Sequence, residues 1–316
     1  MKTLELFIIG MPRSGTKLLR ELINNHQDVY IPDIETLFIP HLLRKFESRK
    51  LNEEQVNDVI EELKNSLFFF YYLKDHSFDF NNLHLNGITI KELINKLFAE
   101  LAEQEGSKAS ILGDKSPNYI QDINLLLQYY PTAKFIHIVR DPRDYALSVN
   151  KAWKKNMMRA THRWVVGVSK IQQLPQEQNK QVMEVKYEAL IENPQEILSA
   201  ICEFLGIPFS RELTSIRRQV EKVGDAKSLK VLAGNHGKFH KQLSARKIEA
   251  IEKLTILNLK HYNYPYSTKS TKNLLPTRQM LFYWQMNDGL NLALFNFKAH
   301  GIKNGLKKII KAIKHR

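Results

Sequence analysis

A short loop near the start of the chain combines glycines with cations and hydroxyl side chains, in the order Gly10, Met11, Pro12, Arg13, Ser14, Gly15, Thr16 and Lys17. An apolar run at residues 4–9 precedes it and leucines at helical spacing follow it, which predicts a strand, a tight loop and a helix. Backbone N–H groups in such a loop point inward, and the start of the helix adds positive partial charge. We therefore expect the loop to bind a phosphate group.

The residue order within the loop narrows the choice of phosphate ligand. A nucleotide-hydrolysing P-loop needs lysine and then serine or threonine directly after its last glycine, whereas here Gly15 is followed by Thr16 and then Lys17. No predicted strand end offers an aspartate for magnesium, since the apolar run 134–139 continues directly into Arg140. A dinucleotide fold is excluded because Gly-x-Gly occurs nowhere in the chain. The loop is suited to neutralise phosphate with cations and hydroxyls, without a metal.

Two further motifs follow in the chain. One reads IHIVRDPRDYALS at residues 136–148, and the other reads VKYEAL at residues 185–190, ahead of FLG at residues 204–206. Together with RSGT at residues 13–16, these motifs resemble, in the same order, those of the sulfotransferases that use 3′-phosphoadenosine 5′-phosphosulfate (PAPS). The resemblance covers residues 4–265, and it implies an O-sulfotransferase that requires no metal.

The resemblance assigns donor-binding roles to several parts of the chain. The 5′-phosphosulfate would be bound by Arg13, Ser14, Gly15, Thr16 and Lys17. Arg13 would stabilise the charge that develops on the leaving oxygen. Arg140 and Ser148 would hold the 3′-phosphate, to which the fork of an arginine is suited; the plain alternative for Arg140 is an ion pair with a neighbouring aspartate. Tyr187 matches a position that lines the adenine pocket, and the desulfated product would be adenosine 3′,5′-bisphosphate (PAP).

Glu35 is the candidate catalytic base. It stands in PDIETLFIP at residues 32–40 and resembles the base position of the tyrosylprotein sulfotransferases, where a Glu-Thr pair follows the phosphate loop at a similar distance. A carboxylate fits this role because an alcohol is a poor nucleophile until its proton is taken. The plain alternative is a helix-start acid favoured by the dipole, and His26 and Asp33 are the other candidate bases.

Lys115 is the further candidate catalytic residue beside Glu35 and Arg13. It stands in GDKSP at residues 113–117, directly after a predicted strand. It resembles the Lys-x-Pro element that supplies a cation to the transferred sulfuryl group. A purely structural lysine is the alternative.

The late part of the chain departs from the family pattern. Cytosolic members complete the nucleotide clamp with Arg-Lys-Gly-x-x-Gly, whereas GNHGKF at residues 234–239 keeps the glycines and lacks the two cations before them. We assign Gly237 and Lys238 to the nucleotide. The missing cations are expected to be replaced by Lys230, Lys238 or Lys241.

The elements that would position these residues alternate along the chain. Short apolar runs rich in β-branched residues at 110–113, 134–139 and 181–185 are typical of strands, and each precedes a helical pattern. Such alternation predicts an α/β class, P-loop-like fold with a central, mostly parallel β-sheet flanked by helices. Helices are also expected at 194–205, closed by a glycine, and at 245–259.

Residues 1–266 are predicted to form the sulfotransferase domain. Within them, residues 36–108 have helical patterns and are predicted to be an inserted cap on the acceptor side. Clustered glycines predict a mobile loop over 224–240. Residues 267–316 are predicted to be a linker followed by a basic, amphipathic, helical C-terminal extension.

The charge of the chain is strongly positive, with 47 Lys and Arg against 33 Asp and Glu and a net charge of +14 among 316 residues. This excess predicts attraction to polyanions, anionic lipid surfaces or small phosphorylated ligands. Residues 302–316 hold six of the cations and no acid, with Leu306, Ile309, Ile310 and Ile313 at helical spacing. A basic amphipathic helix on an anionic membrane and a docked terminal helix both remain open.

Other features exclude several classes of protein. The longest apolar run, residues 67–73, is too short to cross a bilayer, and the single cysteine, Cys202, allows no internal disulfide. The first ten residues lack a small-residue cleavage site, so a signal peptide is not expected. His236 and His240 have no further ligands near them in the sequence, so no metal site is expected. The sequence predicts a cytoplasmic protein, with peripheral membrane binding as an open alternative.

These observations predict a PAPS-dependent O-sulfotransferase that modifies a hydroxyl-bearing acceptor. A glycan or glycolipid ranks first as acceptor, while a tyrosine or peptide hydroxyl and a small metabolite stay open. Two alternatives come from other classes: a P-loop nucleotide kinase or phosphotransferase, and a non-catalytic basic protein that binds polyanions or membranes. No nucleic-acid partner is expected, and the oligomeric state is left open.

Overall fold

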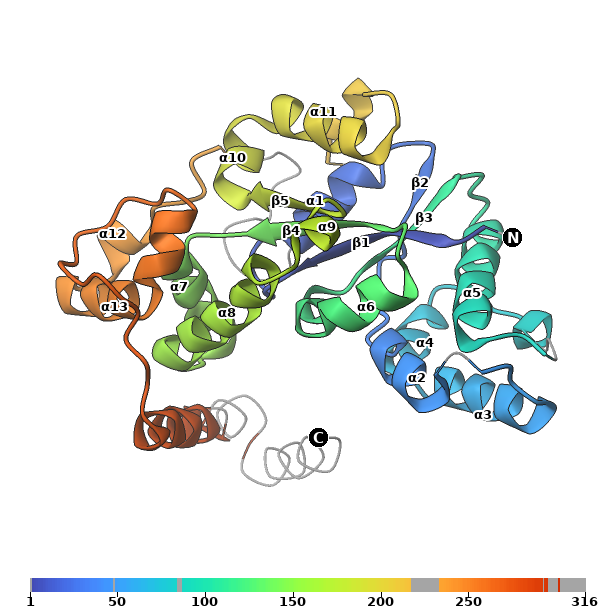
Figure 1. Cartoon of the computed structure of the whole chain (residues 1–316), viewed down its shortest axis with the longest axis horizontal. Coiled ribbons are helices and arrows are strands. Elements are labelled where there is room, and N and C mark those ends of the chain that lie inside the picture. The colour runs from blue at the N-terminus through green and yellow to red at the C-terminus, as the bar shows by residue number, and fades with distance from the viewer. Residues whose placement is uncertain are drawn as a thin grey trace. The chain divides into compact units, whose positions relative to one another are not determined.

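The computed structural model describes residues 2–47, 49–83, 87–216, 233–291, 293–294 and 301. These residues fall into two compact units, whose elements can be followed by residue number in Figure 1. The sheet unit holds the described residues up to Val139 together with those from Gly167 to residue 216 and Ala233. The helical unit holds Arg140–Val166 and the described residues from Gly234 onward.

The sheet unit is built on five strands, all paired in parallel. Their order is β2-β3-β1-β4-β5, and their bounds are β1 Leu4–Gly10, β2 Val29–Tyr30, β3 Ile111–Lys115, β4 Lys134–Val139 and β5 Val182–Lys186. The predicted parallel α/β sheet is confirmed. The sequence missed β2, whose two residues give no periodicity, and ended β3 two residues early, before Asp114 and Lys115.

Successive side chains of the central strand β1 point to opposite faces of the sheet, as the pleat requires. Leu6 and Ile8 belong to the core on one face, which α1 (Thr16–Ile23), α10 (Tyr187–Glu192) and α11 (Pro194–Leu205) cover. Phe7 lies on the other face, where its ring stacks on that of Phe135 at 4.9 Å and meets that of Tyr130 at 5.2 Å. Because both faces are buried, the strands read as nearly continuous apolar runs.

The register of the strands brings the chemically important residues to one edge. Ile8 of β1 pairs with Lys115 of β3, and Gly10 pairs with Ile138 of β4. In a parallel sheet the carboxyl ends of neighbouring strands meet at the same edge, which is where ligands bind in open α/β folds. The loop after β1 and Lys115 at the end of β3 therefore emerge side by side.

Helices fill the stretch between β2 and β3 and complete the sheet unit, and all of them are drawn in Figure 1. Between these strands lie α2 (Ile39–Phe46), α3 (Glu53–Lys64), α4 (Leu67–Tyr72), η1 (Phe80–Leu83) and α5 (Ile90–Gln104). The remaining elements are η2 (Pro117–Asp122), α6 (Ile123–Tyr129), α9 (Gln176–Asn179) and η3 (Arg211–Thr214). Capping boxes at Asn52 and Thr89 start α3 and α5. α11 keeps its predicted bounds and ends at Gly206 in the left-handed conformation.

The helical unit packs α7 (Pro142–Trp153) against α12 (Phe239–Gln242) and α13 (Ala245–His261), and it also contains the first part of α8 (Met157–Gln172). Ala146, Leu147, Phe239, Leu243 and Ile251 form one buried hydrophobic cluster in this unit. The predicted linker lies along α13, since the backbone N–H groups of Ser267 and Thr268 donate to Glu252. A further helix runs over residues 278–291.

Parts of two predicted segments lie outside the described residues. These are the loop over 224–240, as far as residue 232, and the basic tail 302–316. Within the part of the chain that the structure describes, no helix is both long enough and apolar enough to cross a membrane.

Candidate active site

The loop between β1 and α1 has the backbone geometry of an anion site. Arg13 has a φ of 79° and Gly15 a φ of 100°, while the Ser14 N–H donates to the Met11 carbonyl at 3.0 Å. Gly15 is the N-cap of α1, and no described side chain caps this helix. The first N–H groups of α1 are therefore open to an anion, which the positive end of the helix favours.

Both glycines of the loop are required by their neighbours. A Cβ on Gly10 would lie 2.6 Å from the Ile138 carbonyl oxygen, and one on Gly15 would lie 2.4 Å from Cδ2 of Tyr187. The ring of Tyr187, which begins α10 directly after β5, therefore lies against the start of α1. Tyr187 is buried, and its contact with the loop is one that the sequence could not supply.

The hydroxyl of Ser14 is the feature of the loop that a bound anion would best explain. Ser14 is completely buried, and its Oγ has no hydrogen-bond partner among the described residues. A buried hydroxyl without a partner is costly, and a phosphate oxygen on the loop would satisfy it. Thr16 is also buried, whereas Lys17 is exposed. This unpartnered hydroxyl and the two tightly enclosed glycines fit the phosphate of the expected donor.

Glu35 and Lys115 form an ion pair in the sheet unit. Nζ of Lys115 donates to Oε1 of Glu35 at 2.9 Å. The Lys115 side chain is 1% exposed and that of Glu35 is 31% exposed. Burial lowers the pKa of Lys115, the Glu35 carboxylate opposes this, and the positive charges of Arg20 and Lys17 add to the lowering. The pair thus joins a buried cation to a carboxylate that solvent or an acceptor can reach.

A chain of hydrogen bonds holds the residue next to Glu35. The Ile39 N–H donates to the Tyr119 hydroxyl at 3.0 Å, and that hydroxyl lies 2.7 Å from Oγ1 of Thr36. Thr36 in turn donates to the carboxylate of Asp114. Since Thr36 uses its only proton on Asp114, Tyr119 must donate to Thr36. The Thr36 N–H also donates to Oγ of Ser116 at 3.2 Å.

Asp114 is the residue of this network that the sequence analysis overlooked. It is buried, and desolvation raises its pKa to about 6 against the opposing hydrogen bond from Thr36. The predicted strand stops at Gly113, whereas β3 continues through Asp114 to Lys115, so an aspartate lies one residue before the end of this strand. The signal was present in the sequence as an acid directly after an apolar run and beside the candidate lysine. Its hydrogen bond to Thr36 makes it a residue that positions the Glu35 segment.

The other two candidate bases have structural partners. Nε2 of His26 donates to the Pro208 carbonyl at 2.9 Å, while its Nδ1 accepts the Asp28 N–H at 3.1 Å. Both ring nitrogens are therefore in use. Asp33 pairs with Arg20. Of the three candidates, Glu35 has the carboxylate that is paired with the catalytic lysine candidate.

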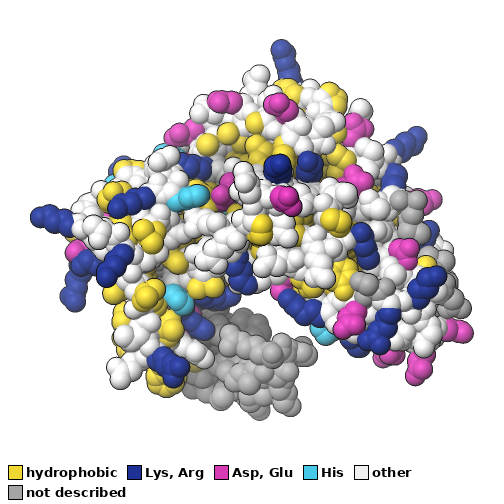
Figure 2. All heavy atoms as spheres, in the orientation of Figure 1, with side chains coloured by type: hydrophobic (Ala, Val, Ile, Leu, Met, Phe, Trp, Pro, Cys, Tyr) yellow, Lys and Arg dark blue, Asp and Glu magenta, His cyan; other side chains and the backbone are white. Residues whose placement is uncertain are grey.

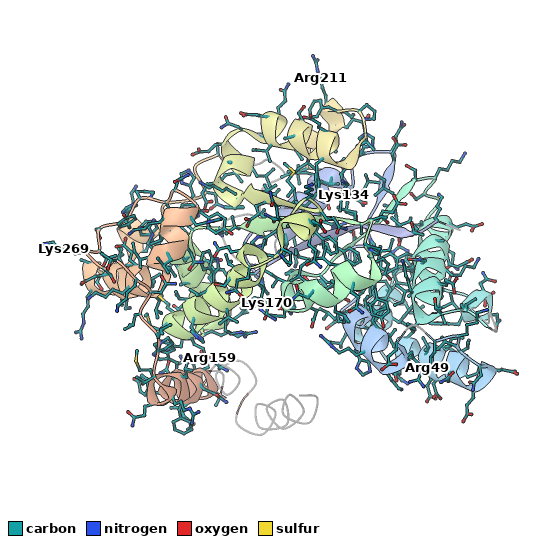
Figure 3. All side chains as sticks on the ribbon, in the orientation of Figure 1. Arg49, Lys134, Arg159, Lys170, Arg211 and Lys269 are labelled. Carbon is teal, nitrogen blue, oxygen red and sulfur yellow. The ribbon has the colours of Figure 1, made fainter. Side chains whose placement is uncertain are left out.

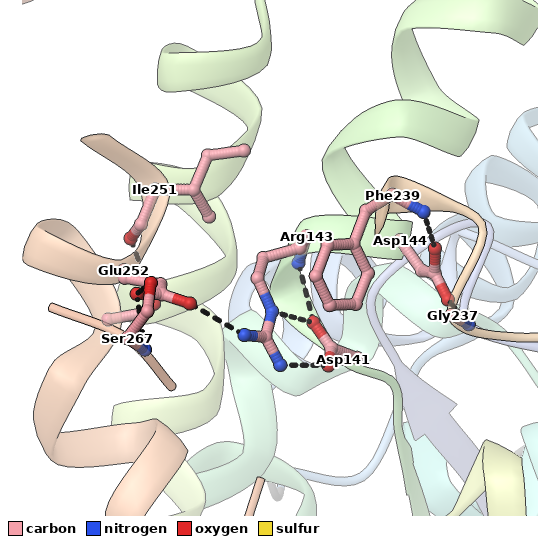
Figure 4. A network of polar contacts seen from close by, with 9 residues as sticks. Asp141, Arg143, Asp144, Gly237, Phe239, Ile251, Glu252 and Ser267 are labelled. Carbon is pink, nitrogen blue, oxygen red and sulfur yellow. Dashed lines mark hydrogen bonds and ion pairs between the residues drawn. The ribbon is translucent and has the colours of Figure 1, made fainter. Parts of the chain in front are cut away.

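In the helical unit, Arg140 follows β4 in the chain and is largely buried, and its Nη2 donates to the Asn235 carbonyl at 3.3 Å. Asp141 and Asp144, the neighbouring aspartates that could form an ion pair with Arg140, have contacts with other residues (Figure 4). Asp141 accepts two hydrogen bonds from the Arg143 guanidinium, at 2.6 and 3.0 Å. Ser148 is half-buried on α7.

Asp144 fixes the segment that carries the late glycine. Its carboxylate accepts the N–H groups of Gly237 at 2.5 Å and Phe239 at 3.0 Å (Figure 4). Lys238, between them, is half-buried and precedes α12. Of the proposed replacement cations, Lys241 is exposed on α12 and Lys230 lies outside the described residues.

Two further observations concern metals and charge. No cluster of three or more potential metal ligands occurs among the described residues, and the His240 ring instead lies 4.0 Å from that of Phe239. Figure 2 shows lysines and arginines interspersed with acids over the visible part of the helices between β2 and β3. These helices present both signs of charge.

The sequence and the fold match known proteins. The model of the Sulfotransferase family matches residues 5–211. Protein-tyrosine sulfotransferase A of Caenorhabditis elegans is 24% identical over 215 residues, which are 65% of this chain and 50% of that protein. Protein-tyrosine sulfotransferase 1 of Danio rerio is 25% identical over 238 residues, 72% of this chain and 59% of that protein. The match spans about half the length of these relatives.

A solved structure has a similar fold. The sulfotransferase domain from the Synechococcus PCC 7002 olefin synthase superposes with a TM-score of 0.57 at 22% sequence identity. The match covers 84% of this chain and 98% of that domain. At this identity the similarity concerns the fold.

Proposed function

The chain belongs to the sulfotransferase family, and from this premise we propose that it transfers the sulfuryl group of PAPS to an acceptor hydroxyl. The observation that carries the proposal is the Glu35–Lys115 pair. It lies at the sheet edge where the β1–α1 loop emerges, and in that loop the buried Ser14 hydroxyl has no partner among the described residues. A carboxylate, a buried cation and an anion-binding loop are the groups that in-line sulfuryl transfer needs.

The loop supplies the donor-binding half of this chemistry. When bound, PAPS supplies a sulfuryl group joined to a phosphate that can leave. The N–H groups at the start of α1, the Ser14 hydroxyl and the Lys17 ammonium would bind phosphate oxygens. Arg13 would offset the negative charge that grows on the leaving group, a contribution whose loss typically costs about 10²–10³-fold in rate.

Glu35 and Lys115 supply the acceptor half. Lys115 occupies Oε1 of Glu35, so the proton of the acceptor hydroxyl would be taken by Oε2. The partly exposed carboxylate can meet an acceptor, while the buried ammonium can stabilise negative charge on the transferred group. The Thr36–Asp114 hydrogen bond supports this role because it orients the backbone beside Glu35.

The remaining donor contacts rest on the motifs. We assign Arg140 and Ser148 to the 3′-phosphate, Tyr187 to the adenine, and Gly237 and Lys238 to the nucleotide clamp. The proposed domain comprises residues 1–266, with 36–108 as the acceptor-side insertion and 267–316 as the extension.

The acceptor class is a separate part of the proposal. The names of the curated relatives and the Glu35-Thr36 pair favour a tyrosine hydroxyl, whereas the sequence alone ranked a glycan or glycolipid first. Incubation with sulfur-labelled PAPS and a panel of tyrosyl peptides, glycans, glycolipids and small alcohols distinguishes them. Label on tyrosyl peptides alone would remove the glycan assignment, and label on glycans alone would remove the tyrosine assignment.

Donor identity is tested by thermal unfolding with PAP, compared with ATP plus magnesium. A ligand at 100 times its Kd adds about 2.7 kcal/mol, which raises Tm by roughly 5 °C or more for a chain of this size. We expect this rise with PAP, and its loss in Arg140→Ala. A larger rise with ATP and magnesium would support a kinase. A wild type that binds polyanions but shows no turnover, and whose binding is unchanged in Glu35→Gln and Arg13→Ala, would support a non-catalytic protein.

A further inference from the structure

The helix at residues 278–291 exposes an apolar stripe. Phe282, Met286 and Leu290 recur every four residues and are 66%, 50% and 60% exposed. Leu294 continues the spacing at 65%, and Tyr283 beside the stripe is 65% exposed. Residues three and four apart share a helix face, so these side chains form one surface. Contiguous apolar surface of this kind marks an interaction site.

Other residues of this helix hold it on α8, within the helical unit. Trp284 is 5% exposed and its ring lies 6.5 Å from that of His162. The Asp288 carboxylate accepts Nη1 of Arg159 at 2.8 Å and the Asn156 N–H at 2.5 Å. Arg159 is labelled in Figure 3 beside this helix. The buried tryptophan and the ion pair account for the attachment of the helix, so the apolar stripe is left for another partner.

The net charge of the sequence segment that contains the stripe identifies that partner. From Ser267 to Arg316 the chain has ten Lys and Arg and one acid, Asp288, so this segment contributes 10 − 1 = +9 of the net +14. The single acid is already paired with Arg159. A second copy would bring the same positive charge against the first, which opposes association. An anionic lipid surface attracts the cations and also accepts the apolar side chains.

We propose that the face formed by Phe282, Tyr283, Met286, Leu290 and Leu294 is a membrane-binding surface that seats the helix on an anionic lipid bilayer. The aromatic and aliphatic side chains enter the boundary between headgroups and acyl chains, while the net positive charge of the segment 267–316 attracts the lipid phosphates. The surface is independent of the Glu35–Lys115 pair, and its loss would leave sulfuryl transfer to a small soluble acceptor unchanged.

Vesicle sedimentation of the full chain tests this surface. The vesicles are phosphatidylcholine alone or phosphatidylcholine with about one third phosphatidylglycerol. Phe282→Ser/Met286→Ser removes two side chains of the stripe without changing charge. The matched control is Leu67→Ser/Phe70→Ser on α4. The Leu67 and Phe70 side chains are 63% and 59% exposed, close to the values of the stripe.

We expect the wild type and the α4 variant to bind the anionic vesicles, more weakly at high salt. The Phe282/Met286 variant should lose at least about tenfold in partitioning, as expected for two large apolar groups kept in water. Equal Tm values and superimposable circular dichroism spectra establish that the variants are folded. Wild type that stays in the supernatant at low salt would overturn the proposal, as would undiminished binding of the Phe282/Met286 variant. If sedimentation equilibrium shows a dimer for the wild type and a monomer for the Phe282/Met286 variant, the stripe would instead be assigned to contact with a second copy.

Discussion

The ammonium of Lys115 and the carboxylate of Glu35 lie 2.9 Å apart, although eighty positions separate them in the chain. Their meeting depends on β3, which pairs with the central strand and ends at Lys115. It also depends on Thr36, which is bound to Asp114 one residue earlier in β3. Two consecutive residues of β3 thus hold the Glu35 segment: Lys115 binds the side chain of Glu35, and Asp114 binds that of Thr36.

Replacing Glu35 should remove turnover while leaving the fold intact. In Glu35→Gln the amide oxygen can still accept from Lys115, but it cannot take a proton from the acceptor. We expect a fall in kcat of about 10²–10⁴-fold, with PAP still raising Tm. Single-turnover transfer of labelled sulfate measures this. If Asp33→Asn shows this fall in kcat and Glu35→Gln keeps the wild-type rate, the role of base would be reassigned to Asp33.

The pH dependence of transfer should report on Lys115. Because burial lowers its pKa, the cation should be lost, and kcat/KM should fall, below the ordinary lysine value of 10.5. Arginine stays charged throughout this range, so Lys115→Arg, where it retains measurable activity, should move the alkaline limb upward. A limb that stays in place in this variant would show that another group titrates.

Gly15→Ala should abolish donor binding. The new methyl group would lie 2.4 Å from Tyr187, in a residue whose φ of 100° already disfavours a side chain. Gly206→Ala is the matched control, because Gly206 also has a positive φ, of 77°, but its Cβ would meet nothing within 4 Å among the described residues. PAP titration followed by Tm should show binding for the control alone. Binding of PAP by Gly15→Ala with wild-type affinity would contradict the assigned role of the loop.

Asp114→Asn should stabilise the protein in a pH-dependent way. The pKa of Asp114 is raised to about 6 in the folded state from 3.8, so its favourable contribution is complete below about pH 4 and is lost as pH rises through 6. The loss amounts to roughly 3 kcal/mol at neutral pH. The variant should therefore unfold at a higher temperature than the wild type at pH 8, with a gap that narrows toward pH 4. A gap that is constant with pH would contradict this.

Arg143→Ala should destabilise the helical unit. The Arg143 guanidinium joins Asp141 to Glu252 with hydrogen bonds of 2.6 to 3.0 Å, and Glu252 also accepts from the residues that follow α13 (Figure 4). Removing one partner of a buried ionic network costs about 3–5 kcal/mol, since it leaves uncompensated charge. Urea unfolding followed by circular dichroism measures the loss. The exposed Arg211→Ala serves as control, expected to change stability by no more than about 0.5 kcal/mol.

The local parts of the fold could be predicted because each leaves a local signal. The apolar runs at residues 4–9 and 134–139 and the glycine-rich loop appear in the structure nearly as the sequence indicates. The contact between Thr36 and Asp114 could not, since it joins residues seventy-eight positions apart. Neither could the capture of the Gly237 and Phe239 N–H groups by Asp144. A lone acid has no periodicity, and its partner becomes known only when the strands and helices are placed.

The hydrogen bond from the Ile39 N–H to the Tyr119 hydroxyl ties the start of α2 to the network of Asp114. Helices α2, α3 and α4 follow beyond that tether. Their outer surfaces can therefore change in sequence without moving the carboxylate and the ammonium that meet behind them. Under the proposed assignment of residues 36–108 to the acceptor side, substitutions in these helices would change the acceptor preference and leave the Glu35–Lys115 pair in place. A chimaera that exchanges these helices between two relatives would be the natural starting point for redirecting the enzyme to a chosen acceptor.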